Sequence, residues 1–287
     1  MKHKKIIYSL MSFLLVLSLI FFGILSYEKS QKLRVIFLNV GQGDAILVMQ
    51  GSNQVLIDGG PNGQILMEKL GRYVPFWDRK IETIIATHPD QDHIEGLVEA
   101  MRNYKVDSII ETSIQSESQI YKKYAELVVQ RKIQKVEARA GTKIKLNQVE
   151  MEILSPKEKI SIDAVKDTNE HSVVTKLVFG QNSFLFTGDL PDNKEMELID
   201  DNANLKAGVL KVAHHGSKYS TSEEFLEKVD PDQAIISVGK NNRYGHPSQE
   251  ALERIKNRNI GILRTDEVGD IIYECEFPEQ ECAIIAN

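Results

Sequence analysis

One seven-residue segment constrains the fold of this 287-residue chain more than any other. Residues 87–93 read Thr-His-Pro-Asp-Gln-Asp-His, between an apolar strand-like run and residues with helical hydrophobic spacing. In extended backbone His88 and Asp90 point to the same side, and Asp92 and His93 can then turn toward a second ion. A helix cap needs only one acid. The segment therefore favours a divalent-metal site at a strand–helix junction.

The composition is that of an ordinary globular protein. Hydrophobic residues make up 42% and charged residues 26%, which excludes a disordered chain, a collagen-like chain and a polytopic membrane protein. Two cysteines are too few for a disulfide-dense scaffold or a four-cysteine zinc site. The formal net charge of −6 argues against a general nucleic-acid coat. A nuclease remains compatible with that charge, because bound metal ions supply positive charge locally.

The N-terminus carries a membrane signal. Residues 6–25 contain no charge and follow a basic tetrapeptide at positions 2–5. A helix of this length spans about 30 Å, enough to cross a bilayer. We expect residues 1–26 to be an uncleaved single-pass anchor with the rest of the chain extracytoplasmic, and a cleaved signal peptide of a secreted protein is the alternative. Residues 27–32 are then a linker, and residues 33–287 form one domain.

Export would place the two cysteines in an oxidising compartment. Cys275 and Cys282 lie on apolar runs at 271–277 and 281–285. A two-residue loop at Pro278-Glu279 places them directly opposite each other, which predicts a cross-strand disulfide. Two unrelated small hydrophobic residues are the alternative.

The order of elements predicts two sheets packed together with helices outside, a four-layer αβ/βα sandwich. Strands alone come first, then strand–helix units, and the second half of the chain repeats this order. The expected strands lie at 33–40, 45–50, 54–58, 82–87, 107–111, as a pair within 143–154, and at 173–179, 183–187, 208–213 and 233–238. Four expected helices lie at 64–77, 118–130, 191–199 and 248–256. One more begins after His93, and another begins after a capping box at 221–224.

More acids and histidines stand where these expected strands end. Asp189 follows the strand at 183–187, and His214 and His215 follow the strand at 208–213. His246 comes after the strand at 233–238, and His171 precedes the strand at 173–179. Because ligands of α/β folds gather beyond one edge of the sheet, we expect these side chains to approach the 87–93 segment.

The motifs together resemble the metallo-β-lactamase superfamily. The resemblance rests on Asp58-Gly59-Gly60, on residues 87–93, on Thr187-Gly188-Asp189 and on His214-His215-Gly216-Ser217. More narrowly, residues 39–44 (Asn-Val-Gly-Gln-Gly-Asp), Asp90 and residues 244–247 (Tyr-Gly-His-Pro) resemble the extracytoplasmic domain of the ComEC family of competence DNA-uptake proteins. The resemblance covers about residues 33–275. That family also has a many-helix channel, whereas this chain has one apolar span, so a separate channel protein becomes a candidate partner.

The resemblance implies two divalent metal ions, Mn²⁺ or Zn²⁺. His88 and Asp90 would hold the first ion, with a third ligand near residues 169–172 that is either His171 or Asn169. Asp92 and His93 would hold the second ion. These assignments come from the family pattern and not from spacing alone.

Residues in the second half of the chain would complete the coordination of both ions. Asp189 would bridge them, and either His214 or His215 would complete the second ion, the other contacting substrate. His246 would bind substrate or a transition-state oxygen.

The resemblance also gives roles to residues around the ligands. Asp58 would orient the His88 loop, and Asp44 would do the same or serve only as a turn acid. Arg243 and Lys218 are close enough in sequence to these motifs to meet a phosphate, although Lys218 reads better as a solvated surface residue.

The expected activity is metal-dependent hydrolysis. A carboxylate at Asp90 makes the site harder, which favours manganese or magnesium without excluding zinc. Two ions would generate a bridging hydroxide, positioned by Asp92 and Asp189, with His246 as proton donor. β-Lactam hydrolysis is disfavoured, because Asp90 and Asp189 replace the histidine and cysteine typical of those enzymes.

The leading interpretation is therefore a membrane-anchored extracytoplasmic phosphodiesterase. Single-stranded DNA is one candidate substrate, and a teichoic-acid or phosphocholine diester of the cell envelope is the other. An alternative from a different class is a non-catalytic module that binds DNA or a partner at the membrane. The sequence leaves the oligomeric state open.

Overall fold

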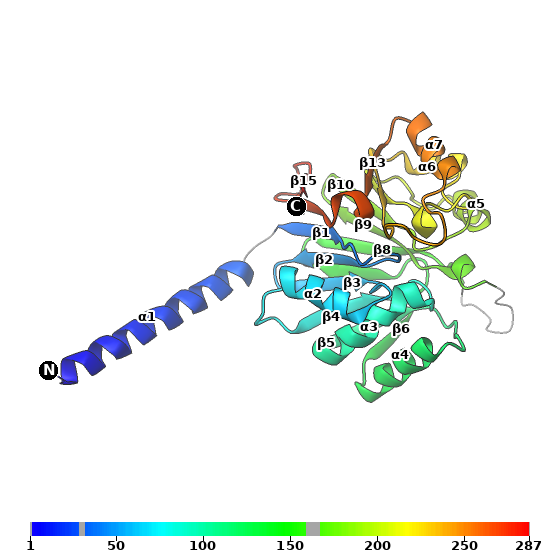
Figure 1. Ribbon diagram of the computed structural model, residues 1–287. Coiled ribbons are helices and arrows are strands. Elements are labelled where there is room, and N and C mark those ends of the chain that lie inside the picture. Colours follow the sequence, from blue (N-terminus) through cyan, green and yellow to red (C-terminus); the bar gives the residue numbers. More distant parts are fainter. Residues whose placement is uncertain (1, 29–31, 159–166, 287) are drawn as a thin grey trace.

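The computed structural model describes residues 2–28, 32–158 and 167–286. Within them, two β-sheets pack face to face and helices cover both outer faces (Figure 1). The predicted four-layer αβ/βα sandwich is therefore confirmed. The polar composition of residues 157–170 predicts a loop, and much of this segment lies outside the described residues.

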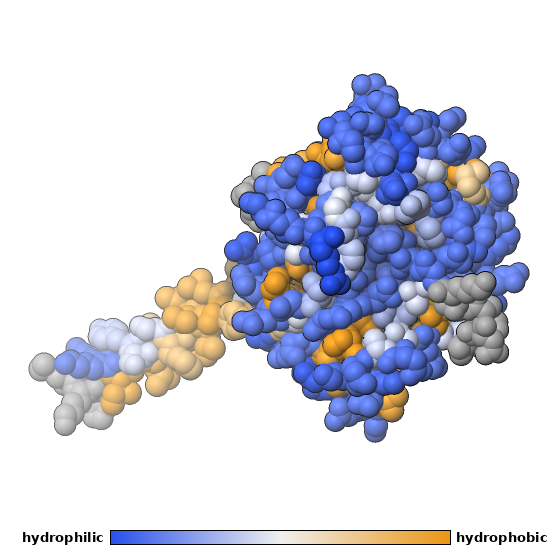
Figure 2. Space-filling model, turned by 45° about the vertical axis from the view of Figure 1, so that its right-hand side comes forward, coloured by the Kyte–Doolittle hydropathy of each residue, from blue (hydrophilic) through white to orange (hydrophobic). Residues whose placement is uncertain are grey.

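The N-terminal helix stands apart from the sandwich. Helix α1 (Lys2–Glu28) contains a 22-residue apolar stretch, Lys4–Leu25, whose length and composition suit a membrane span. This stretch is exposed and contributes nothing to the three hydrophobic clusters of the protein (Figure 2). The core of the sandwich is thus complete without α1.

The first sheet has eight strands in the order β15-β14-β1-β2-β3-β4-β5-β6. Helices α2 (Gly63–Tyr73), α3 (Gln91–Asn103) and α4 (Gln119–Gln130) bury their apolar faces on its outer side. The strands are β1 (Leu33–Phe37), β2 (Ile46–Gln50), β3 (Asn53–Ile57), β4 (Lys80–Ile85), β5 (Lys105–Glu111), β6 (Gln134–Glu137), β14 (Ile271–Cys275) and β15 (Ala283–Ala286).

The second sheet has seven strands in the order β13-β12-β11-β10-β9-β8-β7. Its outer face packs on helices α5 (Asp192–Asp200), α6 (Glu223–Val229) and α7 (Gln249–Asn257). A single-turn helix, α8 (Thr265–Val268), follows the last strand of this sheet. The strands are β7 (Lys143–Leu146), β8 (Val149–Ser155), β9 (Val174–Phe179), β10 (Asn182–Phe186), β11 (Val209–Lys211), β12 (Gln233–Ile236) and β13 (Gly261–Arg264).

The direction of the strands creates one functional edge. Strands β3 to β6 run parallel to one another, and so do β10 to β13. The inner faces of both sheets bury one common apolar cluster, which includes Phe37, Phe184, Phe186 and Tyr273. The carboxyl ends of the parallel strands therefore meet at one edge of the sandwich, where loops can bring polar side chains together.

Cys275 and Cys282 form a disulfide, with a Cα–Cα distance of 4.1 Å. The prediction of a two-residue loop is wrong, because β14 ends at Cys275 and β15 begins at Ala283. The pairing of Glu274 with Ala283 still places the two cysteines side by side. The disulfide closes this longer turn at the edge of the first sheet.

The N-cap of α6 differs from the predicted capping box. The Ser222 hydroxyl accepts a hydrogen bond from the Phe225 amide, so Ser222 and not Thr221 caps the helix. Thr221 instead has a positive φ of 57°, and its hydroxyl accepts from the Ala213 amide just before the two histidines.

Candidate metal centre

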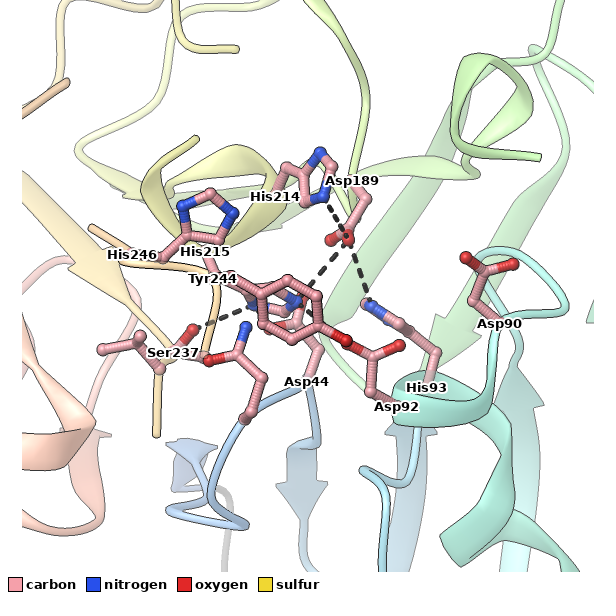
Figure 3. A network of polar contacts seen from close by, with 12 residues as sticks. Asp44, Asp90, Asp92, His93, Asp189, His214, His215, Ser237, Tyr244 and His246 are labelled. Carbon is pink, nitrogen blue, oxygen red and sulfur yellow. Dashed lines mark hydrogen bonds and ion pairs between the residues drawn. The ribbon is translucent and has the colours of Figure 1, made fainter. Parts of the chain in front are cut away.

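Loops from both sheets bring the predicted ligands to the same edge of the sandwich. His88 and Asp90 lie between β4 and α3, and Asp92 and His93 lie in the first turn of α3. Asp189 follows β10, and His214 and His215 lie in a 3₁₀ turn, η3 (Ala213–Gly216), after β11. Figure 3 shows His93, His214 and His215 directed toward the Asp189 carboxylate. The expectation that strand-end residues from distant parts of the chain meet is thus met by the geometry.

Three histidines are each fixed through a contact of the Nδ1 atom, which leaves the Nε2 atom free to bind a ligand. The Nδ1 atom of His93 lies 2.8 Å from Asp58 Oδ2, and that of His88 lies 3.0 Å from Thr87 Oγ1. His215 Nδ1 donates to the Ser237 carbonyl oxygen at 2.9 Å. Among the described residues, the buried Nε2 atoms of all three rings have no hydrogen-bond partner. This is the arrangement by which proteins orient metal-binding imidazoles.

The Asp189 carboxylate lies at the centre of the histidines. Its Oδ2 atom is 3.4 Å from His93 Nε2, 3.5 Å from His215 Nε2 and 3.7 Å from His214 Nε2. Its buried Oδ1 atom lacks a hydrogen-bond partner within the described ranges. Buried polar atoms without partners are costly, so this donor set fits a cation between the rings.

Two groups of potential ligand atoms each share residues with one predicted ion, although His93 belongs to both groups and Asp90 to neither. His88, His93 and Asp189 form one group, and Asp92, His93 and His215 form the other, with all ligand atoms of a group within 4.8 Å of one another. Nitrogen and carboxylate ligands in this number suit manganese, zinc or iron. The residues present therefore fit a divalent-metal centre.

His214 and His215 differ in a way that the sequence does not show. His215 is buried and belongs to two ligand groups, whereas His214 is partly exposed and its ring lies 5.6 Å from that of His246. Both residues have positive φ angles, 49° and 55°, which are strained for residues with a side chain and recur at functional sites. The geometry favours His215 as the ligand and leaves His214 facing the entrance.

Asp90 occupies the N-cap position of α3, but its side chain makes no capping hydrogen bond. Its Oδ1 atom accepts from the Thr168 hydroxyl at 2.7 Å, and its Oδ2 atom lies 3.9 Å from His88 Nε2. The alternative of a simple cap is therefore wrong for Asp90. The carboxylate lies beside His88, where the first ion was predicted.

Both candidates for the third ligand of the first ion lie in one short turn. His171 ends a 3₁₀ turn, η2 (Asn169–His171), and joins none of the ligand groups found among the described residues. His171 shares this separation with Asp90, so its role as a ligand stays a prediction. The buried Oδ1 atom of Asn169 lacks a hydrogen-bond partner in the described part of the chain, which supports Asn169 as the other candidate.

Asp58 fixes the loop that carries His88. Its carboxylate accepts from the Thr87 amide at 2.8 Å and from the Thr87 hydroxyl at 2.6 Å, in addition to its contact with His93. The Gly59 amide also donates to the His93 carbonyl oxygen. Asp58 thus orients ligands of both predicted ions, as the family pattern implied.

Burial disfavours the charged form of each of these groups, and the charges of neighbouring side chains set the direction in which each pKa shifts. His215 and His93 outweigh burial and hold the pKa of Asp189 well below its ordinary value. Asp189 and Asp58 likewise hold the pKa of His93 well above its ordinary value. Burial and the adjacent His93 lower the pKa of His88. The Asp189 carboxylate therefore stays ionised and can receive a cation between the rings.

Lys211 is a residue of the site that sequence analysis missed. Its ammonium group is buried and lies 2.8 Å from Asp44 Oδ2, while Asp44 Oδ1 lies 3.4 Å from His215 Nδ1. Burial raises the pKa of Asp44, but Lys211 and His215 outweigh it and lower that pKa to about 2. Asp44 is thus more than a turn acid. The signal in the sequence was a lysine ending an otherwise apolar strand.

Close backbone contact holds α3 against the turn after Asp58. A side-chain methyl at Gly96 would overlap the Gly59 carbonyl oxygen, whereas one at Gly71 in α2 would meet open space. We expect Gly96→Ala to lower the free energy of unfolding by about 2 kcal/mol, although alanine favours helices. Gly71→Ala should instead leave it unchanged or raise it by up to about 1 kcal/mol. Urea denaturation of both variants checks this, and equal effects would contradict it.

An exposed tyrosine paired with a cation lies at the rim of the centre, and a second such pair follows the His214–His215 turn in sequence. The Arg243 guanidinium lies 4.9 Å from the centre of the Tyr244 ring, and Lys218 lies 5.0 Å from that of Tyr219. The Tyr244 ring is stacked with that of His246, with 6.0 Å between the ring centres. A row of rings therefore leads from solvent at Tyr244 through His246 and His214 to Asp189 (Figure 3).

The comparison with family models decides the family. The model described as the metallo-beta-lactamase superfamily matches residues 38–240, which include every predicted metal ligand from His88 to His215. The chain belongs to the metallo-β-lactamase superfamily.

Relatives by sequence are competence proteins of the ComEC type. ComE operon protein 3 of Bacillus subtilis is 35% identical over 254 residues, which is 82% of this chain and 32% of that protein. Recombination protein 2 of Haemophilus influenzae is 30% identical over 260 residues, 88% of this chain and 30% of that protein. This superfamily member thus spans about a third of the length of the curated relatives it matches.

Solved structures support the fold alone. The metallo-β-lactamase fold protein YhfI of Bacillus subtilis superposes with a TM-score of 0.58 at 11% identity, covering 85% of this chain and all of that one. Zn²⁺-bound PqqB of Methylobacterium extorquens superposes with a TM-score of 0.52 at 10% identity, covering 80% of this chain and 97% of that one. Proteins this distant share a fold without sharing a reaction, so the reaction must be argued from the site.

Proposed function

We propose that this chain is a membrane-anchored extracytoplasmic phosphodiesterase that uses two divalent metal ions, Mn²⁺ or Zn²⁺. One observation carries the proposal: buried ligand atoms of His88, His93, His215 and Asp189, which lack hydrogen-bond partners in the described part of the chain, converge at one sheet edge. Such ions, when bound, lower the pKa of water and stabilise charge on phosphoryl oxygens. The superfamily supplies metal-dependent hydrolases, and the names of the relatives place several of them in competence and recombination.

The chain's own residues would each perform a simple task. His88, Asp90 and Asn169 would hold the first ion, and Asp92, His93 and His215 the second, with Asp189 between them. Asp58 and Asp44 keep the rings aimed inward, so that little reorganisation is needed when substrate arrives.

His246 would contact the substrate rather than the metal. Its ring lies beside His214 at the entrance, and its buried Nδ1 atom has no hydrogen-bond partner among the described residues. Burial and the nearby His214 and His215 lower its pKa, so the ring is uncharged near neutral pH. A neutral imidazole can donate one hydrogen bond to a phosphoryl or leaving oxygen.

The rim favours single-stranded nucleic acid over an envelope diester as substrate. Tyr244 is 53% exposed and Tyr219 is 63% exposed, and each carries a cation against its ring. Exposed aromatic rings beside cations are the surface on which unpaired bases stack while phosphates are neutralised. Polyol phosphates of the envelope have no planar ring for such a surface.

The test compares three substrates under manganese and under zinc: bis(p-nitrophenyl) phosphate, single-stranded DNA and a phosphocholine diester. We expect hydrolysis of the first two and much slower turnover of the third. Turnover of the phosphocholine diester in preference to DNA would favour the envelope. Bound metal without turnover of any of them would favour the non-catalytic binding module.

The stacking surface has its own prediction. Tyr244→Ala should lower kcat/KM for single-stranded DNA by about tenfold, since stacking of one base contributes about 1–3 kcal/mol. Tyr244→Phe keeps the ring and should retain most of the activity. Steady-state assays of both variants check this, with bis(p-nitrophenyl) phosphate as the reference substrate that should lose less. Equal losses in the two variants would show that the ring face is not used.

A further inference from the structure

The end of the sandwich opposite the metal centre carries a basic groove. A cavity of about 500 Å³ lies there. Among the described residues, it is lined by one carboxylate, Asp107, and by five basic side chains: Arg79, Arg102, Lys105, Arg131 and Lys132. We call these five residues the basic groove. Five cations in one cavity are unexpected on a chain whose formal net charge is −6.

The register of the first sheet shows where this groove lies. Lys80 at the start of β4 pairs with Lys105 at the start of β5, and residues 131–133 precede β6. The metal ligands follow the opposite, carboxyl ends of the same parallel strands. A six-residue strand such as β4 is about 20 Å long, so the groove and the metal centre lie at two ends of the sheet.

Two exposed aromatic side chains flank the groove at the same end. Phe76 is 76% exposed and Trp77 is 45% exposed, and their rings meet edge to face at 4.8 Å. The loop that carries them leads into β4 next to Arg79, and Gln54 at the start of β3 donates to Asp78 in this loop. Aromatic rings next to basic side chains are typical of surfaces at a membrane–water boundary.

The chain enters the sandwich from α1 at this end as well. Leu33, the first residue of β1, pairs with Gln50, and Gln50 pairs with Asn53 at the start of β3. Figure 1 shows α1 leading into β1 on that side. From Glu28 to Leu33 the chain can reach at most about 18 Å. If α1 spans the membrane, the groove end of the domain is therefore held close to the bilayer.

We propose that the basic groove and the Phe76–Trp77 pair rest on the anionic headgroups of the membrane that α1 enters. The groove would bind headgroup phosphates, and the two aromatic rings would enter the interface beside them. The metal centre then faces away from the bilayer, toward substrate in the extracytoplasmic space. This inference rests on α1 as a membrane span and is independent of the reaction at the metal centre.

Trp77 is the single tryptophan of the chain, so its fluorescence reports this contact directly. The experiment uses the full chain in vesicles of phosphatidylcholine with brominated acyl chains, with and without about one third phosphatidylglycerol. We expect a blue shift and at least about twofold quenching of Trp77 in the anionic vesicles, and weaker quenching in neutral vesicles or high salt.

A matched pair of triple variants separates the groove from general charge. Arg102→Gln/Lys105→Gln/Lys132→Gln removes three groove charges and should abolish most of the quenching. Lys206→Gln/Lys228→Gln/Lys256→Gln removes three exposed charges of the other half of the chain and should leave the quenching intact.

Three results would overturn the proposal. One is an unquenched Trp77 in anionic vesicles, and another is equal loss in both triple variants. The third is a groove variant that keeps the quenching but binds single-stranded DNA more weakly, which would assign the groove to nucleic acid.

Discussion

Asp189→Asn is expected to lower kcat/KM for bis(p-nitrophenyl) phosphate by about a thousandfold. The variant keeps the shape of the side chain but removes the charge that lies 3.4–3.7 Å from three histidine rings. As a proposed ligand of the metal centre, Asp189 would contribute several kcal/mol of transition-state stabilisation, and each 1.36 kcal/mol is about tenfold in rate. We also expect fewer than two bound ions per chain.

Metal content and steady-state rates of the same preparation measure this effect. Asp200→Asn is the matched control, because Asp200 is an exposed residue at the end of α5. It should bind metal and turn over substrate as the unaltered chain does. An Asp189→Asn chain with full activity would remove Asp189 from the centre.

Lys211→Met should destabilise the fold by about 4 kcal/mol, because it leaves the Asp44 carboxylate buried without its cation. Both side chains are almost fully buried, and Lys211 Nζ also donates to the Val212 carbonyl oxygen. For a domain of this size, such a loss corresponds to a fall in Tm of about 10 °C.

The double variant Lys211→Met/Asp44→Asn is the informative comparison. It removes both charges, so it should be more stable than Lys211→Met alone. Its affinity for the second metal ion should still fall about tenfold or more, because Asp44 no longer supports the ring of His215. A double variant less stable than the single one would contradict a paired role for these two residues.

Much of the centre could be predicted because its residues are close in sequence. Residues 88–93 carry four candidate ligands at one strand–helix junction, and the strand and the helix on either side follow from hydrophobic spacing. The fold followed from the order of such units. Asp189 and the His214–His215 pair followed from their positions at the ends of expected strands, and the family pattern supplied their roles.

The remainder depends on contacts between distant segments. The choice between His214 and His215 rests on the burial of His215 and on its contact with the Ser237 carbonyl oxygen, which two identical neighbours in sequence cannot reveal. Asn169 gains support as the third ligand only because its Oδ1 atom is buried without a partner among the described residues. Lys211 was hidden because its ion pair joins the loop after β1 to a strand of the other sheet.

Short edge elements were also missed. Strand β6 has four residues with mostly exposed side chains, and β13 has four of intermediate burial. Neither shows the alternation of buried and exposed positions that sequence patterns rely on. Their pairing with β5 and β12 depends on the neighbouring strand and not on their own composition.

The most direct test of the central claim measures metal and turnover together. The full chain is dialysed against manganese or zinc, its bound metal is counted by mass spectrometry, and hydrolysis of bis(p-nitrophenyl) phosphate is followed in the same sample. We predict two ions per chain and turnover that a chelator removes and added metal restores. A chain that binds no metal and hydrolyses nothing would contradict the metal-dependent phosphodiesterase.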